Sequence, residues 1–264
     1  MKLPKLEDLD VDGKRILVRV DLDYKDAEDG NKRQEVLLPT LDYLVDKAER
    51  IVLLGHRGRP GGRVDESLSL QTTGNRLEAY LRQKWGDERV GKLNMYVMEN
   101  LRFNPGEEAN DEHYARHLAE EGDIYVNEAF ASSHRNHASI VSLPTFLPRA
   151  AGFHFISEVE NLSRVLKSPK RPLISIISGV KEDKLGYVDD FRKFSDVILI
   201  GGRLPDLVQN SVLRQSSGLM LSKVEASKFH GLAKQSQVPS GTWQSGVGKI
   251  QNHKSQIKIA KLTA

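Results

Sequence analysis

Short runs of Ile, Val and Leu, each followed by a helical pattern, constrain the fold of this chain more than any other feature. The runs are nearly continuous and do not alternate with polar residues, which is typical of parallel strands covered on both faces. Strands that alternate with helices predict an α/β fold. The expected strands are residues 15–20, 50–55, 95–98, 123–127, 173–178 and 196–201.

Helical patterns lie between these strands. In the first, Leu41, Leu44, Val45 and Ala48 recur at i, i+3, i+4 and i+7 and so form one apolar face. Asp111 is the expected N-cap of the third. The expected helices are residues 40–49, 67–85, 111–120, 157–166 and 183–194, and a weaker pattern predicts a helix over 222–236 and a last strand over 256–261.

We therefore expect two Rossmann-like parallel-sheet units, the first complete and the second reduced. The N-terminal α/β domain covers residues 1–155, a hinge helix and linker covers 156–170, and the second unit covers 171–264. The boundary follows from a helical pattern that ends in Ser-Pro-Lys-Arg-Pro before a new strand begins. No internal repeat accompanies this division.

Composition narrows the class of protein. The chain has no cysteine, which excludes disulfides and thiolate metal sites and fits a reducing compartment. No apolar leader and no run of 18 apolar residues occurs, so we expect a cytoplasmic protein without a membrane partner. Residues 204–264 are basic and rich in Ser and Gln but nearly lack aromatics, so we expect a solvated tail and no nucleic-acid partner.

Cationic side chains follow four successive expected strands, although residues 1–203 carry more acidic than basic groups. The carboxyl ends of parallel strands meet at one edge of a sheet, where ligands bind. Cations gathered there predict an anionic substrate carrying a phosphate and a carboxylate, which the arginine fork binds well. The residues after the four strands are Asp21, Asp23 and Arg33; His56, Arg57 and Arg59; Arg102; and His134, Arg135 and His137.

Several neighbouring residues have a structural interpretation. Arg57 is expected to be solvated, Asp23 to cap a turn and His137 to form structural hydrogen bonds. Arg19 lies within a strand and is expected to be structural, whereas Glu107 and Glu108 follow Pro-Gly and are expected in a solvated turn. No metal-ligand spacing such as H-E-x-x-H and no complete Walker loop occurs, so no protein-held metal is expected.

Five segments, in order, resemble phosphoglycerate kinases. They are G-K-R-I-L-V-R-V-D, an Arg six residues before Pro39, G-H-R-G-R-P, E-N-L-R-F-N-P-G-E-E, and D-I-Y-V-N-E-A-F followed by H-R-x-H-A-S. The resemblance covers residues 1 to about 204. It implies that 3-phosphoglycerate is held by Asp21, Asp23 (in place of the family's Asn), Arg33, His56, Arg59, Arg102 and Arg135. Because the loop after the fourth strand closes the same edge of the sheet, we expect Arg135 to be its direct contact and His134 to be secondary.

The same resemblance makes the second unit the start of a nucleotide domain that takes ATP or ADP with Mg. Lys181 and Lys184 correspond to the family's two lysines, and Gly201 and Gly202 to the start of its triple glycine, which continues here as Arg203. Arg33 and Lys181 are implied to flank the phosphoryl group during transfer. The implied activity is reversible phosphoryl transfer between ATP and 3-phosphoglycerate in glycolysis.

Departures from the family pattern keep alternatives open. Glu128 replaces an Asp and Ala131 a Gly, so we expect binding to differ there first. The family's W-N-G-P segment and G-G-G-D loop do not occur, so the chain is expected to be a truncated or divergent member. The alternatives are a non-catalytic 3-phosphoglycerate-binding module, and a structural half in a homo- or hetero-oligomer. In the second case another chain covers the truncated second sheet and completes the nucleotide site.

Overall fold

A computed structural model of the chain describes residues 3–24, 27–179, 181–202, 204 and 258–261. The chain divides into two compact units, residues 1–162 and 163–264, which are called unit 1 and unit 2 below. This division falls inside the linker expected at 156–170. The helix expected at 222–236 lies outside the described residues.

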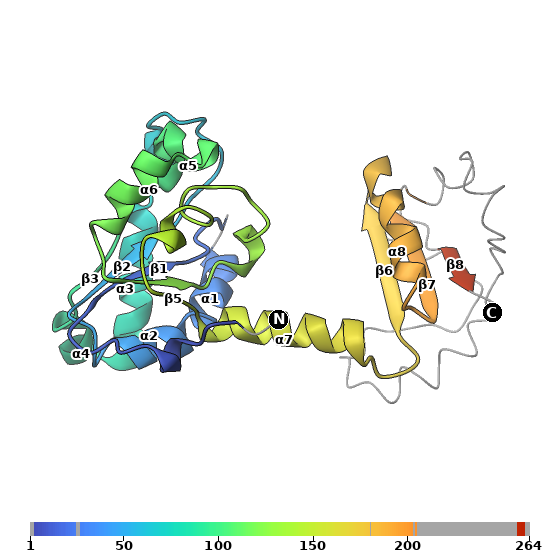
Figure 1. The fold of residues 1–264 in the computed structure, drawn as a ribbon, viewed down its shortest axis with the longest axis horizontal. Coiled ribbons are helices and arrows are strands. Elements are labelled where there is room, and N and C mark those ends of the chain that lie inside the picture. The colour runs from blue at the N-terminus through green and yellow to red at the C-terminus, as the bar shows by residue number, and fades with distance from the viewer. Residues whose placement is uncertain (1–2, 25–26, 180, 203, 205–257, 262–264) are drawn as a thin grey trace. The chain divides into compact units, whose positions relative to one another are not determined.

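Unit 1 is built on a five-stranded parallel sheet in the order β3-β2-β1-β4-β5 (Figure 1). The central strand β1 pairs with β2 on one side and with β4, more than a hundred residues later, on the other. Four strands confirm the sequence prediction to within one or two residues, and β5, which is short and Ala-rich, was missed. The bounds are β1 Arg15–Arg19, β2 Arg50–Leu54, β3 Met95–Val97, β4 Ile124–Asn127 and β5 Arg149–Ala151.

Both faces of this sheet are covered, as the continuous apolar runs predicted. Ile16, Val18 and Leu53 pack on one side beneath α2 and α3, and Leu17 and Val52 pack on the other against α6 and residues 138–147. Figure 1 shows these helices on opposite sides of the strands. The helices are α1 Ala27–Glu35, α2 Leu38–Leu44, α3 Gln71–Trp85, α4 Asp87–Gly91, α5 Pro105–Ala109, α6 Glu112–Ala119 and α7 Phe153–Lys167.

Helix boundaries differ from the expected ones where caps and polar sequence decide them. Asp111 does cap α6, because its carboxylate accepts the N–H of Tyr114 at 2.7 Å. The helix expected at 40–49 ends at Leu44, and α1 occupies a stretch that was expected to be a loop. Helix α1 is polar and holds Gly30, so its sequence lacks an apolar stripe.

Unit 2 contains a three-stranded sheet in which β6 (Ile174–Gly179) and β7 (Val197–Gly202) run parallel. The strand β8 (Lys258–Lys261) pairs antiparallel with β7, so the expected last strand is confirmed over its described residues. The helix expected at 183–194 is a 3₁₀ segment, η6 (Glu182–Tyr187), followed by α8 (Val188–Arg192).

The sheet of unit 2 packs one face of β6 into a core and exposes the other. Ile177 is buried with Ile198, Ile200 and Leu185, whereas Ile176 is 72% exposed. The expectation that β6 is covered on both faces is therefore wrong within the described residues, because α8 and η6 lie on one side only. No helix of the described residues combines the length and the apolar character that crossing a membrane requires.

Candidate functional site

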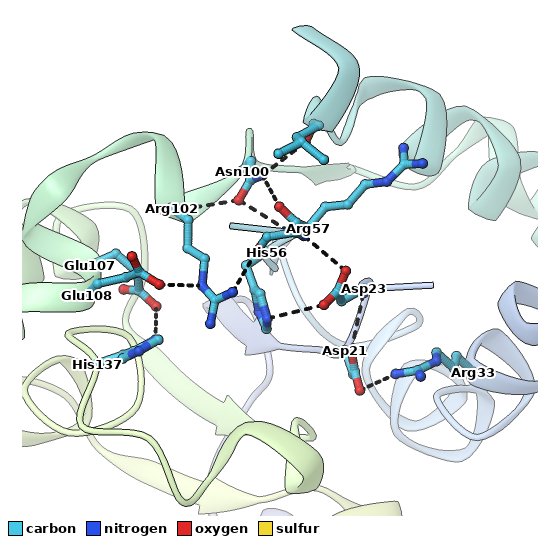
Figure 2. A network of polar contacts seen from close by, with 12 residues as sticks. Asp21, Asp23, Arg33, His56, Arg57, Asn100, Arg102, Glu107, Glu108 and His137 are labelled. Atoms are coloured by element: carbon cyan, nitrogen blue, oxygen red, sulfur yellow. Dashed lines mark hydrogen bonds and ion pairs between the residues drawn. The ribbon is translucent and has the colours of Figure 1, made fainter. Parts of the chain in front are cut away.

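Side chains from four strand ends meet at one edge of the unit 1 sheet (Figure 2). Asp21 and Asp23 follow β1, His56 follows β2, and Arg102 lies on the turn after β3. Because β2, β1 and β4 are neighbours, the loop after β4 brings Arg135 to the same place. We call Arg19, His56, Arg102, Arg135 and His137 the cationic cluster, because the charges of the other four residues all act on His56.

Arg102 is only 1% exposed, yet most of its hydrogen-bonding capacity is unused. Its Nη1 donates to Gly58 O at 2.5 Å, and its Nε lies 3.3 Å from Glu108 Oε1 in an ion pair. Neither Nε nor Nη2 has a hydrogen-bond partner among the described residues. Burial and then the neighbouring Arg135 lower the pKa of this guanidinium. A buried cation with open donors is arranged to receive an anion.

Asn100 fixes the turn that carries Arg102. Its side-chain oxygen accepts the backbone N–H groups of Arg102 at 3.1 Å and Arg57 at 3.3 Å. Its amide donates to Arg57 O at 2.8 Å and to Leu68 O at 2.9 Å. The loops after β2 and β3 are thereby held together, and the Arg57 side chain points away from His56 (Figure 2). Arg57 is half-buried rather than fully solvated.

His56 is buried and neutral. Its Nδ1 lies 2.9 Å from Arg19 Nη2, and its Nε2 lies 3.9 Å from Asp23 Oδ2. Burial, followed by the positive charges of Arg19, Arg102 and Arg135, lowers the pKa of His56 to about 2. The ring therefore offers the site a neutral N–H group and not a fourth charge.

The carboxylates after β1 hold other parts of the site in place. Asp23 is exposed and accepts the backbone N–H of Gly58 at 3.0 Å, so it caps the loop after β2 as expected. Asp21 forms an ion pair with Arg33. Arg33 thus reaches the site from α1, and not from the loop in which it was expected.

The loop after β4 contributes Arg135, whose Nε is buried without a hydrogen-bond partner among the described residues. His134 is exposed, whereas His137 is buried with its Nδ1 3.7 Å from Glu107 Oε1. That Nδ1 makes no hydrogen bond within the described chain, so the prediction of a structural hydrogen-bonder is wrong for this atom. Arg59 is exposed and forms no hydrogen bond or ion pair with any described residue.

Glu107 and Ser139 support the site from behind, and sequence reasoning missed both. Glu107 is 0% exposed, so the expected solvated turn is wrong for it, whereas Glu108 is exposed. The carboxylate of Glu107 accepts the hydroxyl hydrogen of Ser139 at 2.6 Å and the backbone N–H of Ser139 at 3.0 Å. The sequence held one signal, because Asn104 before Pro105 is an N-cap pattern that starts helix α5.

Glu128 caps helix α7 instead of facing the cationic cluster. Its carboxylate accepts the N–H of Phe155 at 2.9 Å and of His154 at 3.3 Å, and it bonds Thr40. Burial raises its pKa, and these hydrogen bonds oppose the rise. A Cβ at Gly152 would lie 2.2 Å from the carboxyl of Glu128, so only glycine fits there.

The expected nucleotide residues of unit 2 lie at the ends of β6 and β7. Lys184 donates to Ser178 O at 3.2 Å. Its side chain passes close to Gly179, where a Cβ would lie 2.9 Å from Lys184 Cδ. A Cβ at Gly201 would lie 3.2 Å from Ser178 Oγ. Lys181 is exposed before η6, and Gly202 ends β7, while Arg203 is outside the described residues. No three His, Cys, Asp or Glu side chains of the described residues gather as metal ligands.

Known proteins resemble this chain in sequence and in fold. A family model described as phosphoglycerate kinase matches residues 6–213. The phosphoglycerate kinase of Moorella thermoacetica is 39% identical in an alignment spanning 220 residues, and the match covers 75% of this chain and 54% of that protein. That of Desulforudis audaxviator is 34% identical over 85% of this chain and 61% of its own length.

Solved structures agree with these relatives. The phosphoglycerate kinase of Coxiella burnetii has a TM-score of 0.67 at 28% identity, over 89% of this chain and 62% of the other. That of Pyrococcus horikoshii has a TM-score of 0.64 at 27% identity, over 88% of this chain and 62% of the other. The chain thus spans a little over half the length of the curated relatives that it matches.

Proposed function

The chain belongs to the phosphoglycerate kinase family, and from that premise we propose that unit 1 binds 3-phosphoglycerate at the cationic cluster. One observation carries the proposal. Arg102 and Arg135 both keep buried guanidinium N–H groups without partners, beside a His56 that stays neutral. A phosphate or carboxylate would satisfy these donors and balance charges that the described residues leave only partly balanced.

We further propose the reaction of the family, reversible phosphoryl transfer between ATP and 3-phosphoglycerate. Such transfer relies on positioning and charge neutralisation and needs no covalent nucleophile. Arg33 in unit 1 and Lys181 in unit 2 are proposed to neutralise the moving phosphoryl group, and Lys184 with Gly201 and Gly202 to hold the nucleotide phosphates. The family's Mg is assigned no ligand among the described residues, because no carboxylate cluster is present there.

Calorimetry with 3-phosphoglycerate tests the substrate proposal. We expect saturable heat with the wild-type chain and a loss of at least tenfold in affinity for Arg135→Ala, because a charge-assisted bond of about 1.5–3 kcal/mol is removed. Arg116→Ala, on the surface of α6, is the matched control and should bind normally. Equal affinity of the Arg135 variant and the wild type would overturn the site.

A coupled assay with ATP, Mg and 3-phosphoglycerate tests turnover separately. Product formed by the wild type and lost in Arg33→Gln and Lys181→Met supports the proposed reaction. Binding of 3-phosphoglycerate without turnover would instead identify this chain as a binding module. Turnover that appears only when a second chain is added would identify it as half of a composite enzyme.

A further inference from the structure

A continuous chain of hydrogen bonds links a buried carboxylate to the imidazole of His56. Ser139 donates its hydroxyl proton to Glu107 Oε1 at 2.6 Å and accepts from Arg19 Nε at 2.9 Å. Arg19 then reaches His56 Nδ1 through Nη2 at 2.9 Å. Glu107, Ser139 and Arg19 are each 0% exposed, so water does not compete for these bonds.

Each bond in this chain has one possible direction. A guanidinium carries only donors, so His56 Nδ1 must accept, and the proton of the neutral ring must reside on Nε2. The oxygen of Ser139 receives the Arg19 hydrogen, so its own hydrogen goes to Glu107. Arg19 Nη1 also donates to Val20 O at 2.6 Å, which prevents the guanidinium from turning.

The carboxylate of Glu107 also balances part of the buried positive charge. Arg19 is buried among other cations and forms no ion pair with a carboxylate among the described residues, so Glu107 supplies a balancing charge across one hydroxyl. The charged groups that act on His56 are Arg19, Arg102, Arg135 and His137, and Asp23 lies 3.9 Å from Nε2. No hydrogen bond to a described residue uses Nε2, so this donor is available.

We propose that Arg19, Ser139 and Glu107 are positioning residues that hold His56 as a neutral donor, with its Nε2–H directed at the bound anion. The nature of that anion rests on the function proposed above, whereas the state of the ring belongs to the ligand-free chain. A neutral donor binds an anion without gaining or losing a proton. The ring therefore orients the ligand without adding a charge, and the arginines supply the charge.

Nitrogen NMR of the wild-type chain labelled with ¹⁵N-histidine tests the proposal without any ligand. We expect His56, assigned by its absence in His56→Gln, to show an unprotonated Nδ1 and a protonated Nε2. Neither signal should titrate above about pH 4, since an ordinary histidine titrates near 6.5. A protonated Nδ1, a mixture of tautomers, or titration near pH 6.5 would overturn the proposal.

The variant Ser139→Ala tests whether the chain of bonds acts through His56. We expect mixed tautomers for His56 and an affinity for 3-phosphoglycerate that is about three- to tenfold weaker, as for loss of one buried hydrogen bond. Ser142→Ala is the matched control, because Ser142 also donates to a side-chain oxygen, Asn110 Oδ1 at 2.9 Å, outside the cluster. Lower stability of Ser139→Ala with unchanged tautomer and affinity would reduce the residue to a structural role and refute the inference.

The two proposals fail in different ways. If the wild type shows the expected tautomer but no heat with 3-phosphoglycerate, the ligand is wrong and the positioning of His56 stands. If 3-phosphoglycerate binds but Nδ1 carries the proton, the positioning chain is wrong and the substrate stands. Should Ser139→Ala fail to fold, the wild-type spectrum and Glu107→Gln, which keeps an acceptor oxygen for Ser139, still decide the question.

Discussion

The strand ends of unit 1 and those of unit 2 both present cationic side chains, but the two sets are held in different ways. In unit 1, Arg19 and Arg102 are buried and fixed by carbonyl, hydroxyl and ring contacts. In unit 2, Lys181 and Lys184 are exposed, and the ammonium group of Lys184 makes one hydrogen bond to a described residue, Ser178 O. Arginine sits where the geometry is rigid, and lysine where water still solvates the charge.

The difference separates two ways of binding an anion. Folding of unit 1 buries its cationic side chains close together, which lowers the free energy of unfolding. Binding of an anion compensates for this cost. Unit 2 leaves its lysines in water, so little is lost before binding and less is gained from each contact. We therefore expect removal of a buried cation in unit 1 to lower ligand affinity without lowering stability, or while raising it. Removal of a lysine in unit 2 should change ligand affinity alone.

Arg102→Met should give the largest effect. Removal of a buried arginine with two open donors is expected to weaken 3-phosphoglycerate binding by about 100-fold, or about 3 kcal/mol, in calorimetry. The same change should leave the free energy of unfolding in urea unchanged or higher, because like charges no longer crowd. Arg82→Met, which breaks surface ion pairs with Glu78 and Asp87, is the control. Unfolding at lower urea for Arg102→Met would break the comparison.

Glu128→Ala should lower the free energy of unfolding of unit 1 by about 2 kcal/mol, as loss of a buried helix cap does. Amide exchange at Phe155 should accelerate most, because its N–H loses its acceptor. The pKa of Glu128 is raised in the folded state. The contribution of its ionisation to the free energy of unfolding is therefore fully present at acid pH and declines as pH rises through that pKa. Glu158→Ala, on the same helix but half exposed, is the control and should change little.

His56→Gln should flatten the acid side of the stability profile. The pKa of His56 is lowered to about 2 in the fold, so its contribution is complete above the unfolded pKa near 6.5 and declines below it. Between those values the wild type should lose about 1 kcal/mol per pH unit more than the variant in urea titrations. His117→Gln, at an exposed surface position, should keep the wild-type slope. Parallel profiles for wild type and His56→Gln would contradict a buried neutral ring.

Lys184→Met should give the smallest effect. We expect ADP to bind no more than about tenfold more weakly, because an exposed lysine contributes about 1 kcal/mol. The midpoint of urea unfolding and the affinity for 3-phosphoglycerate should not change. Lys193→Met, which removes another exposed lysine paired with Asp190, is the control. A clear loss of stability would show that unit 2 is as tightly organised as unit 1.

The sequence predicted the positions of the strands and of most cations, because both depend on local pattern. Runs such as Arg15–Arg19 are recognisable from their consecutive Ile, Leu and Val residues, and the order of the motifs indicated the family. The supporting contacts could not be predicted in the same way. Arg19 and Ser139 are 120 positions apart and Glu107 and Ser139 are 32 apart, so only the folded sheet brings them together.

Burial of charge was the main source of error. Glu107 has the sequence context of a solvated turn, and nothing in its neighbours reveals the hydroxyl of Ser139 that pairs with it. Helix α1 was missed for the opposite reason, since a polar segment with a glycine lacks the apolar period that marks helices. The error at Glu107 thus concerns an environment made by a distant segment, whereas the error at α1 concerns the local pattern.

The order of strands β3-β2-β1-β4-β5 also has a consequence for synthesis of the chain. Strand β1 can pair with β2 soon after both strands leave the ribosome, but its other partner, β4, begins only at Ile124. Until then the edge of β1 is unpaired and open to other chains. Nascent chains that stop before β4 should therefore depend on chaperones and aggregate readily, whereas chains that extend past Ala151 should not.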